Sequence, residues 1–140
     1  ALDEETKALV QDMVCEHSQM YSRQVIGFTD FTDEERERFR PVRQCMVRTH
    51  PVTGRKSLYL SSHAGEIVGW PMPEARGFLR DLTEHATRPE FTYRHAWRDH
   101  DLVVWDNLAT MHRSTPFEDQ KYRRELRRIT TIDVPAAAHA

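Results

Sequence analysis

Residues 102–130 read LVVWDNLATMHRSTPFEDQKYRRELRRIT, and this stretch decides the expected fold. An apolar run leads into a turn at Asp106-Asn107, and a short segment after the turn carries His112. Apolar runs bounded by turn residues are typical of β-strands. The expected strands are 102–106, 110–113 and 123–133. Because a histidine held on a rigid strand is well placed to bind a metal ion, His112 is the first candidate ligand.

The segment KYRRELRR (121–128) places four arginines on the last expected strand. Successive side chains of a strand point to opposite faces, so Arg124 and Arg128 share one face, whereas Arg123 and Arg127 share the other. A buried arginine needs an anionic partner. One of these pairs is therefore expected to line a cavity and bind a carboxylate. The alternative is a charged edge strand that prevents aggregation.

Upstream of this stretch, the sequence predicts helices and further strands. Apolar residues recur at helical spacing near the N-terminus, a Thr-Asp-Glu-Glu motif begins a second helix, and Pro73 suits the first turn of a third. The turn HPVTGR (50–55) joins two strands. The expected helices are 2–17, 32–40 and 73–85, and the expected strands are 45–49, 56–61 and 91–97. The predicted class is α+β, with most strands in the second half.

Composition narrows the possible functions. A chain of 140 residues has room for one domain. Its net charge of −2 argues against a nucleic-acid-binding module built on residues 121–128, which stays a minor alternative. No apolar run is long enough to span a membrane. The two cysteines, Cys15 and Cys45, show no metal-binding or redox spacing, so we expect reduced thiols in a cytoplasmic protein.

Several motifs recur here in a family's order. They are VWDN at 104–107, then His112, then RxxxRIT at 124–130, preceded by HPxTGxxxLY at 50–59 and SSHAG at 61–65. Together they resemble the C-terminal half of the Fe(II)/2-oxoglutarate-dependent dioxygenases of the taurine and 2,4-dichlorophenoxyacetate (TauD/TfdA) family. The SSHAG segment resembles the herbicide branch most. The resemblance covers essentially the whole chain.

The resemblance implies a fold and a set of site residues. Residues 1–140 would form the C-terminal portion of a double-stranded β-helix (jelly roll) with helical insertions, with the N-terminal half absent and a flexible tail at 135–140. By position, His112 resembles the distal iron ligand and Arg124 the residue that binds 2-oxoglutarate. Arg128 and His63 resemble substrate-binding residues. Counting from His112 would instead select Arg123 and Arg127. Surface or turn roles are expected for His50, Arg55 and Lys56.

The resemblance also implies a reaction. With Fe(II), 2-oxoglutarate and O₂, the enzyme would hydroxylate an anionic aryloxyalkanoate such as 2,4-dichlorophenoxyacetate. Ether cleavage would follow, giving a phenol and an oxoacid, with succinate and CO₂ released. A sulfonate or sulfate ester such as taurine is the alternative substrate class. We expect no nucleic-acid or membrane partner, and a homo-oligomer stays open.

One departure from the family pattern limits what this chain can do. The family takes two of its three iron ligands from an H-x-[DE] motif, yet none of the eight histidines has Asp or Glu two positions later. The two missing ligands are therefore expected to lie outside this chain. Because a single histidine holds Fe(II) weakly, we expect the chain alone to be inactive.

Overall fold

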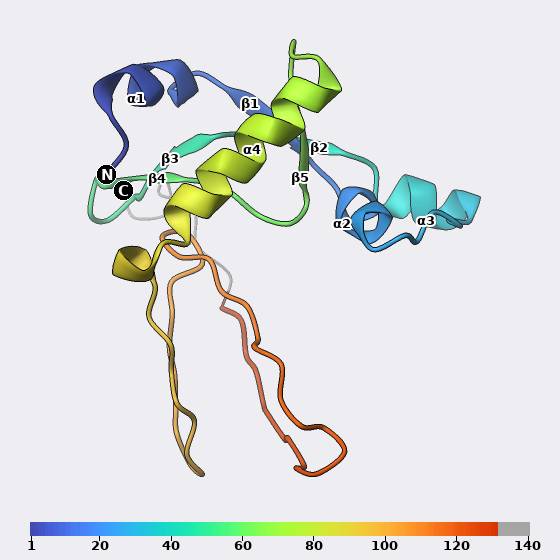
Figure 1. Ribbon diagram of the computed structural model, residues 1–140, viewed down its shortest axis with the longest axis vertical. Helices are drawn as coiled ribbons and strands as arrows, with labels where there is room; N and C mark the ends of the chain where they lie inside the picture. Colours follow the sequence, from blue (N-terminus) through green and yellow to red (C-terminus); the bar gives the residue numbers. More distant parts are fainter. Residues whose placement is uncertain (132–140) are drawn as a thin grey trace, which may run out of the picture.

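The computed structural model describes residues 1–131, and it contains short helices and two small antiparallel sheets (Figure 1). The elements are α1 (Glu4–Val10), β1 (Val14–His17), α2 (Gln19–Val25), α3 (Asp33–Arg38), β2 (Val42–Cys45), β3 (Val47–Thr49), β4 (Lys56–Leu58), β5 (Ala64–Ile67), α4 (Met72–Ala86) and the 3₁₀ helix Pro89–Phe91. The predicted α+β class is confirmed. The tail predicted at 135–140 lies outside the described residues.

Local capping explains where the short helices begin. The Asp3 carboxylate accepts a hydrogen bond of 2.7 Å from the Thr6 backbone N–H and so caps α1. Thr32 and Glu35 form a reciprocal capping box at the start of α3. The helices predicted at 32–40 and 73–85 are therefore present as α3 and α4, with ends shifted by one or a few residues.

The helix predicted over 2–17 is wrong in its second half. α1 ends at Val10, and Val14–His17 is strand β1, which lies at the centre of the sheet β2-β1-β5. Cys15 is opposite Gln44 on one side and Ile67 on the other. Pairing on both edges satisfies the backbone N–H and C=O groups of β1, and Cys15 and Ile67 are buried in the core. The neighbours α2 and β5 were not predicted.

The predicted hairpin is confirmed in part and is tied to the first sheet by Met46. In this hairpin β3 pairs with β4, so that Arg48 lies opposite Ser57. The Met46 N–H donates to the Met13 carbonyl at 2.8 Å, and the Met46 carbonyl accepts from the Tyr59 N–H at 2.7 Å. A single residue between β2 and β3 thus holds both sheets together.

The core lies between the sheets and α4. Its buried side chains come from the segments that carry the strands and from α4, which crosses the strands in Figure 1. The buried residues of the cluster are Val10, Met13, Cys15, Met46, Leu60, Ile67, Ala75, Leu79 and Leu82. Ala75, Leu79 and Leu82 form the buried stripe of α4, and Phe78 packs beside them on Trp70 with ring centroids 5.3 Å apart.

Replacing Met46 with Ala should destabilise this layered region. Met46 is fully buried, so truncation leaves a cavity between the sheets and α4. We expect a loss of about 2–5 kcal/mol in the free energy of unfolding, measured by urea denaturation. Val52→Ala is the control because Val52 is 86% exposed, and it should change stability by less than about 0.5 kcal/mol. Equal effects of the two substitutions would contradict the assigned core.

The strands predicted after α4 are wrong. Residues 92–131 run as long extended loops away from the sheets and back, without strand pairing in the described part of the chain (Figure 1). The segments concerned are 91–97, 102–106, 110–113 and the described part of 123–133. Their alternating apolar residues include Leu102, Val104 and Ile129, which are 88%, 85% and 92% exposed. A strand needs a neighbour for its backbone hydrogen bonds, and no described segment supplies one here.

Among residues 1–131, no helix is both long and apolar enough to cross a membrane.

Candidate functional site

His112 follows a turn whose side chains orient its neighbour Trp105. The Trp105 indole N–H donates to the Asn107 side-chain oxygen at 2.9 Å, which fixes the indole ring. The ring centroids of Trp105 and His112 lie 4.8 Å apart at 51°. The sequence WDN thus gives His112 an aromatic neighbour on one side. The imidazole is otherwise exposed, so a metal ion could reach it.

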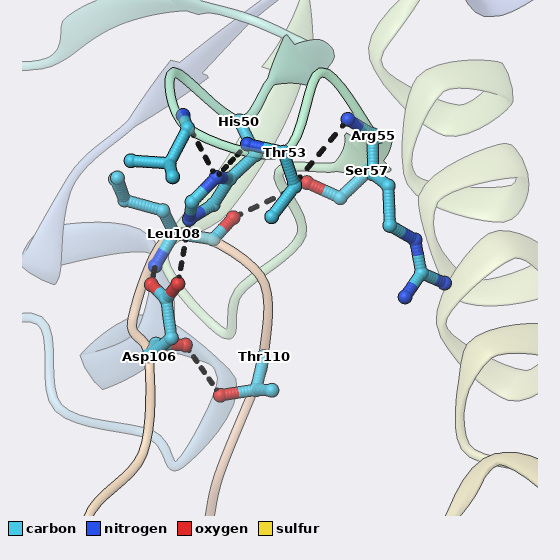
Figure 2. A network of polar contacts seen from close by, with 8 residues as sticks. His50, Thr53, Arg55, Ser57, Asp106, Leu108 and Thr110 are labelled. Atoms are coloured by element: carbon cyan, nitrogen blue, oxygen red, sulfur yellow. Dashed lines mark hydrogen bonds and ion pairs between the residues drawn. The ribbon is translucent and has the colours of Figure 1, made fainter.

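The turn before His112 is held against the hairpin by a histidine–aspartate contact, which Figure 2 shows. His50 Nε2 lies 2.7 Å from Asp106 Oδ2, although 56 positions separate the two residues. The Ser57 hydroxyl adds a second link by donating to the Leu108 carbonyl at 3.2 Å. Two of the quoted motifs, HPxTGxxxLY and VWDN, therefore meet in space. The expected turn role of His50 is confirmed, but its partner Asp106 was missed.

The arginines of 123–128 lie on an exposed loop and not on a strand. The Arg124 guanidinium carbon lies 5.4 Å from the centre of the Phe117 ring, and Arg123 pairs with Glu125 at 3.1 Å. Arg127 lines an open hollow of about 530 Å³ with Asp99, His100 and Glu125. The strand alternation used to group these arginines by face is therefore absent from this segment.

His63 lies beside α2 and β1, and its hydrogen bonds are with other segments than this loop. Its Nδ1 is 2.9 Å from the Ser22 hydroxyl, and its backbone N–H donates to the Ser61 hydroxyl at 3.1 Å. The structure records no contact among His112, Arg124, Arg128 and His63 within residues 1–131. That these four residues form one site stays a prediction.

A stacked cluster around Tyr59 was not predicted. His17 stacks on the Tyr59 ring at 4.8 Å and 17°, and the Arg48 guanidinium carbon lies 3.6 Å from the centre of the same ring. His17 lies on β1 and not on the helix predicted over 2–17, and its ring is half-buried there. Burial, and then the charges of Arg48 and His63, hold the His17 pKa below its usual value. Only the motif residue Tyr59 could have signalled this cluster.

We expect His17 to titrate below the usual histidine value of about 6.5. Because its pKa is lower in the folded state, its contribution to stability is full above about pH 6.5 and is lost as the pH falls through the folded-state pKa. NMR titration of the imidazole protons measures the midpoint. Arg48→Met should raise the midpoint only partly, since burial is the larger cause. A His17 midpoint at or above 6.5 in the unsubstituted chain would contradict this environment.

The described residues do not by themselves form an iron centre. No group of three His, Cys, Asp or Glu side chains within residues 1–131 could hold a metal ion. His112 has the right chemistry for one ligand, since an exposed imidazole is a common donor to Fe(II). His112 as a metal ligand therefore stays a prediction.

Comparison with known proteins places this arrangement in a family. The model of "Taurine catabolism dioxygenase TauD, TfdA family" matches residues 1–130. The chain belongs to the TauD/TfdA family. The chain is similar to the alpha-ketoglutarate-dependent 2,4-dichlorophenoxyacetate dioxygenase of Burkholderia sp. (strain RASC), with 43% identity over 131 residues, 94% of this chain and 44% of that protein. The TauD/TfdA chain therefore spans less than half the length of this curated relative.

Two solved structures resemble this TauD/TfdA chain. AAD-2, crystallised with Mn(II) and N-oxalylglycine, is 64% identical with a TM-score of 0.76, over 78% of this chain and 38% of that one. A taurine dioxygenase from Burkholderia xenovorans is 34% identical with a TM-score of 0.53, over 69% of this chain and 29% of that one. The predicted family is confirmed, and AAD-2 and the 2,4-dichlorophenoxyacetate dioxygenase are more similar in sequence to the chain than this taurine dioxygenase is.

Proposed function

We propose that this chain is the C-terminal portion of an Fe(II)/2-oxoglutarate-dependent dioxygenase that hydroxylates an aryloxyalkanoate such as 2,4-dichlorophenoxyacetate. The complete enzyme would form one double-stranded β-helix in the cytoplasm. The observation that carries the proposal is the 43% identity to a 2,4-dichlorophenoxyacetate dioxygenase across nearly the whole chain. The ordered motifs VWDN, His112 and RxxxRIT support it from the sequence.

His112 would supply one of the three protein ligands to iron in the complete enzyme, and the other two would come from sequence outside this chain. When bound, the metal supplies the oxygen chemistry that couples decarboxylation of 2-oxoglutarate to hydroxylation of the substrate. Trp105 packs beside the imidazole, and its indole is fixed by Asn107. These contacts limit the orientations open to the His112 ring.

Two arginines would bind the carboxylates of 2-oxoglutarate and of the substrate. 2-Oxoglutarate carries two carboxylates, and N-oxalylglycine, present in the AAD-2 crystal, has the same arrangement of acid groups. Arg124 would bind the carboxylate far from the metal, because a guanidinium forms paired hydrogen bonds with a carboxylate. Arg128 would bind the substrate acid group, with His63 in the same pocket. Folding against the missing half would have to bring these side chains together.

The ether-cleaving reaction follows from where hydroxylation occurs. A hydroxyl group added to the carbon beside the ether oxygen gives a hemiacetal. This hemiacetal collapses to a phenol and an oxoacid, and succinate and CO₂ leave as the products of the cosubstrate. The role of this chain is to bind and orient the two acids, which lowers the entropic cost of the reaction.

Succinate release across a substrate panel tests the proposed substrate class. The complete enzyme, the chain together with its N-terminal half, would be incubated with Fe(II), 2-oxoglutarate and either aryloxyalkanoates, taurine or alkyl sulfates. We expect phenol and succinate in equal amounts with an aryloxyalkanoate and little succinate with the sulfur compounds. Preference for taurine or a sulfate ester would instead establish the sulfonate alternative, which the 34% identity to a taurine dioxygenase keeps in view.

A further inference from the structure

The contact between His50 and Asp106 joins two segments that are far apart in sequence (Figure 2). His50 begins the turn after β3, where its carbonyl accepts from the Gly54 N–H at 2.9 Å and its N–H donates to the Arg55 carbonyl at 2.8 Å. The His50 side chain is only 13% exposed, whereas that of Asp106 is 46% exposed. We call this contact the His50–Asp106 bridge. The hairpin side of the bridge is thus firmly held.

The turn sets the tautomer of His50. Its Nδ1 accepts hydrogen bonds from the backbone N–H groups of Val52, at 3.2 Å, and Thr53, at 3.1 Å. A ring nitrogen that accepts a hydrogen bond carries no proton. The proton of the neutral ring is therefore on Nε2, which donates to the Asp106 carboxylate at 2.7 Å. The backbone thereby aims a single N–H at Asp106.

Asp106 passes this restraint to the loop that precedes His112. Its second carboxylate oxygen accepts from the Leu108 N–H at 2.7 Å. Its backbone carbonyl accepts from the Thr110 N–H at 3.0 Å and from the Thr110 hydroxyl at 2.6 Å. The Leu108 N–H, and then His50, keep the Asp106 pKa below its usual value, so the carboxylate is charged at neutral pH. Asp106 therefore closes the loop with its side chain and backbone carbonyl, and its side chain also fastens the loop to the hairpin.

We propose that His50 is a positioning residue that, through Asp106, fixes the loop 106–110 and so the place of His112. The inference rests on the proposed function, because His112 has a position to keep only if it is a metal ligand. Metal-binding histidines depend on partners that orient them, and loss of such a partner weakens metal affinity by about 10- to 100-fold. Here the restraint acts on the backbone leading to the ligand.

Two substitutions at His50 and one control outside the bridge separate positioning from general stability. His50→Phe keeps a ring but removes the donor, whereas His50→Gln retains an N–H that can reach Asp106. His95→Phe is the matched control, because His95 forms a similar contact of 2.9 Å with Asp101. Mn(II) affinity of the complete enzyme, measured by electron paramagnetic resonance, is the main readout. Thermal unfolding is recorded alongside it.

We expect His50→Phe to weaken Mn(II) binding about 10- to 100-fold, His50→Gln to restore most of it, and His95→Phe to leave it unchanged. Asp106→Ala should weaken binding similarly, and the double variant no further, because the two residues act together. Unchanged Mn(II) affinity in His50→Phe would overturn the inference while leaving the proposed function intact. Absence of Mn(II) binding by the unsubstituted enzyme would reject the proposed function itself.

The tautomer gives a test that needs no variant to fold. Nitrogen-15 NMR of the 140-residue chain, labelled on histidine, distinguishes a protonated Nε2 from a protonated Nδ1. We expect His50 as the Nε2–H tautomer, with slow exchange of that proton. A neutral ring with its proton on Nδ1 and none on Nε2 would contradict the bridge directly.

Discussion

Replacing Arg124 with Ala in the complete enzyme should raise the 2-oxoglutarate concentration needed for half-maximal rate by about 30-fold or more. Removing one partner of a buried, hydrogen-bonded charge pair costs about 2 kcal/mol or more, which corresponds to that factor. The maximal rate at saturating 2-oxoglutarate should fall less, since the reacting end of the cosubstrate does not touch this residue. Initial rates of succinate formation at varied 2-oxoglutarate provide the measurement.

Arg123→Ala is the matched control for this prediction. Arg123 is adjacent in sequence, is an arginine as well, and is engaged on the surface with Glu125 at 3.1 Å. We expect its substitution to leave the 2-oxoglutarate requirement near that of the unsubstituted enzyme. An unchanged requirement in Arg124→Ala together with a raised one in Arg123→Ala would show that Arg123 and Arg127 are the functional pair. That result would reject the assignment of Arg124 and Arg128.

Replacing His112 with Ala should have the second large effect. Loss of an orienting partner alone costs about 10- to 100-fold in metal affinity, so loss of a ligand should cost at least about 100-fold. Turnover should fall with Fe(II) occupancy. Equilibrium binding of Fe(II) under anaerobic conditions is the measurement, with His85→Ala as control. His85 lies on α4, with its ring centroid 5.5 Å from that of Phe91. Its replacement should leave Fe(II) binding unchanged. Equal affinity in the His112 and His85 variants would remove His112 from the site.

Local signals predicted the parts of the fold that depend on few residues. α4 has an apolar stripe of period 3.6 and a proline in its first turn, so its residues determine their own conformation. The capping residues Asp3 and Thr32 likewise act within one turn. β1 was missed because Met13, Val14 and Cys15 suit a helix as well as a strand. Pairing with β2 and β5, whose residues lie 25 or more positions away, settles the choice.

After α4, strands were predicted where the structure has extended loops. The alternating residues there gave a strand pattern, yet a strand forms only where another segment completes its hydrogen bonds, and within residues 1–131 these segments remain unpaired. The contacts of the candidate site also depend on residues that lie far apart in the sequence. His112 was recognised from its motif, whereas the link from His50 to Asp106 spans 56 positions and has no local signal. His50 and Asp106 each belong to a motif, but neither motif indicates that the two side chains meet.

The most direct test compares this chain with the complete enzyme. Each is titrated anaerobically with Fe(II) and 2-oxoglutarate, and the metal-to-ligand charge-transfer absorption of the chelated complex is recorded. Because the described residues contain no group of three metal ligands, we expect the band from the complete enzyme and none from the 140-residue chain. A band from the chain alone, or its absence from the complete enzyme, would contradict the claim that this chain supplies one iron ligand to a 2-oxoglutarate dioxygenase.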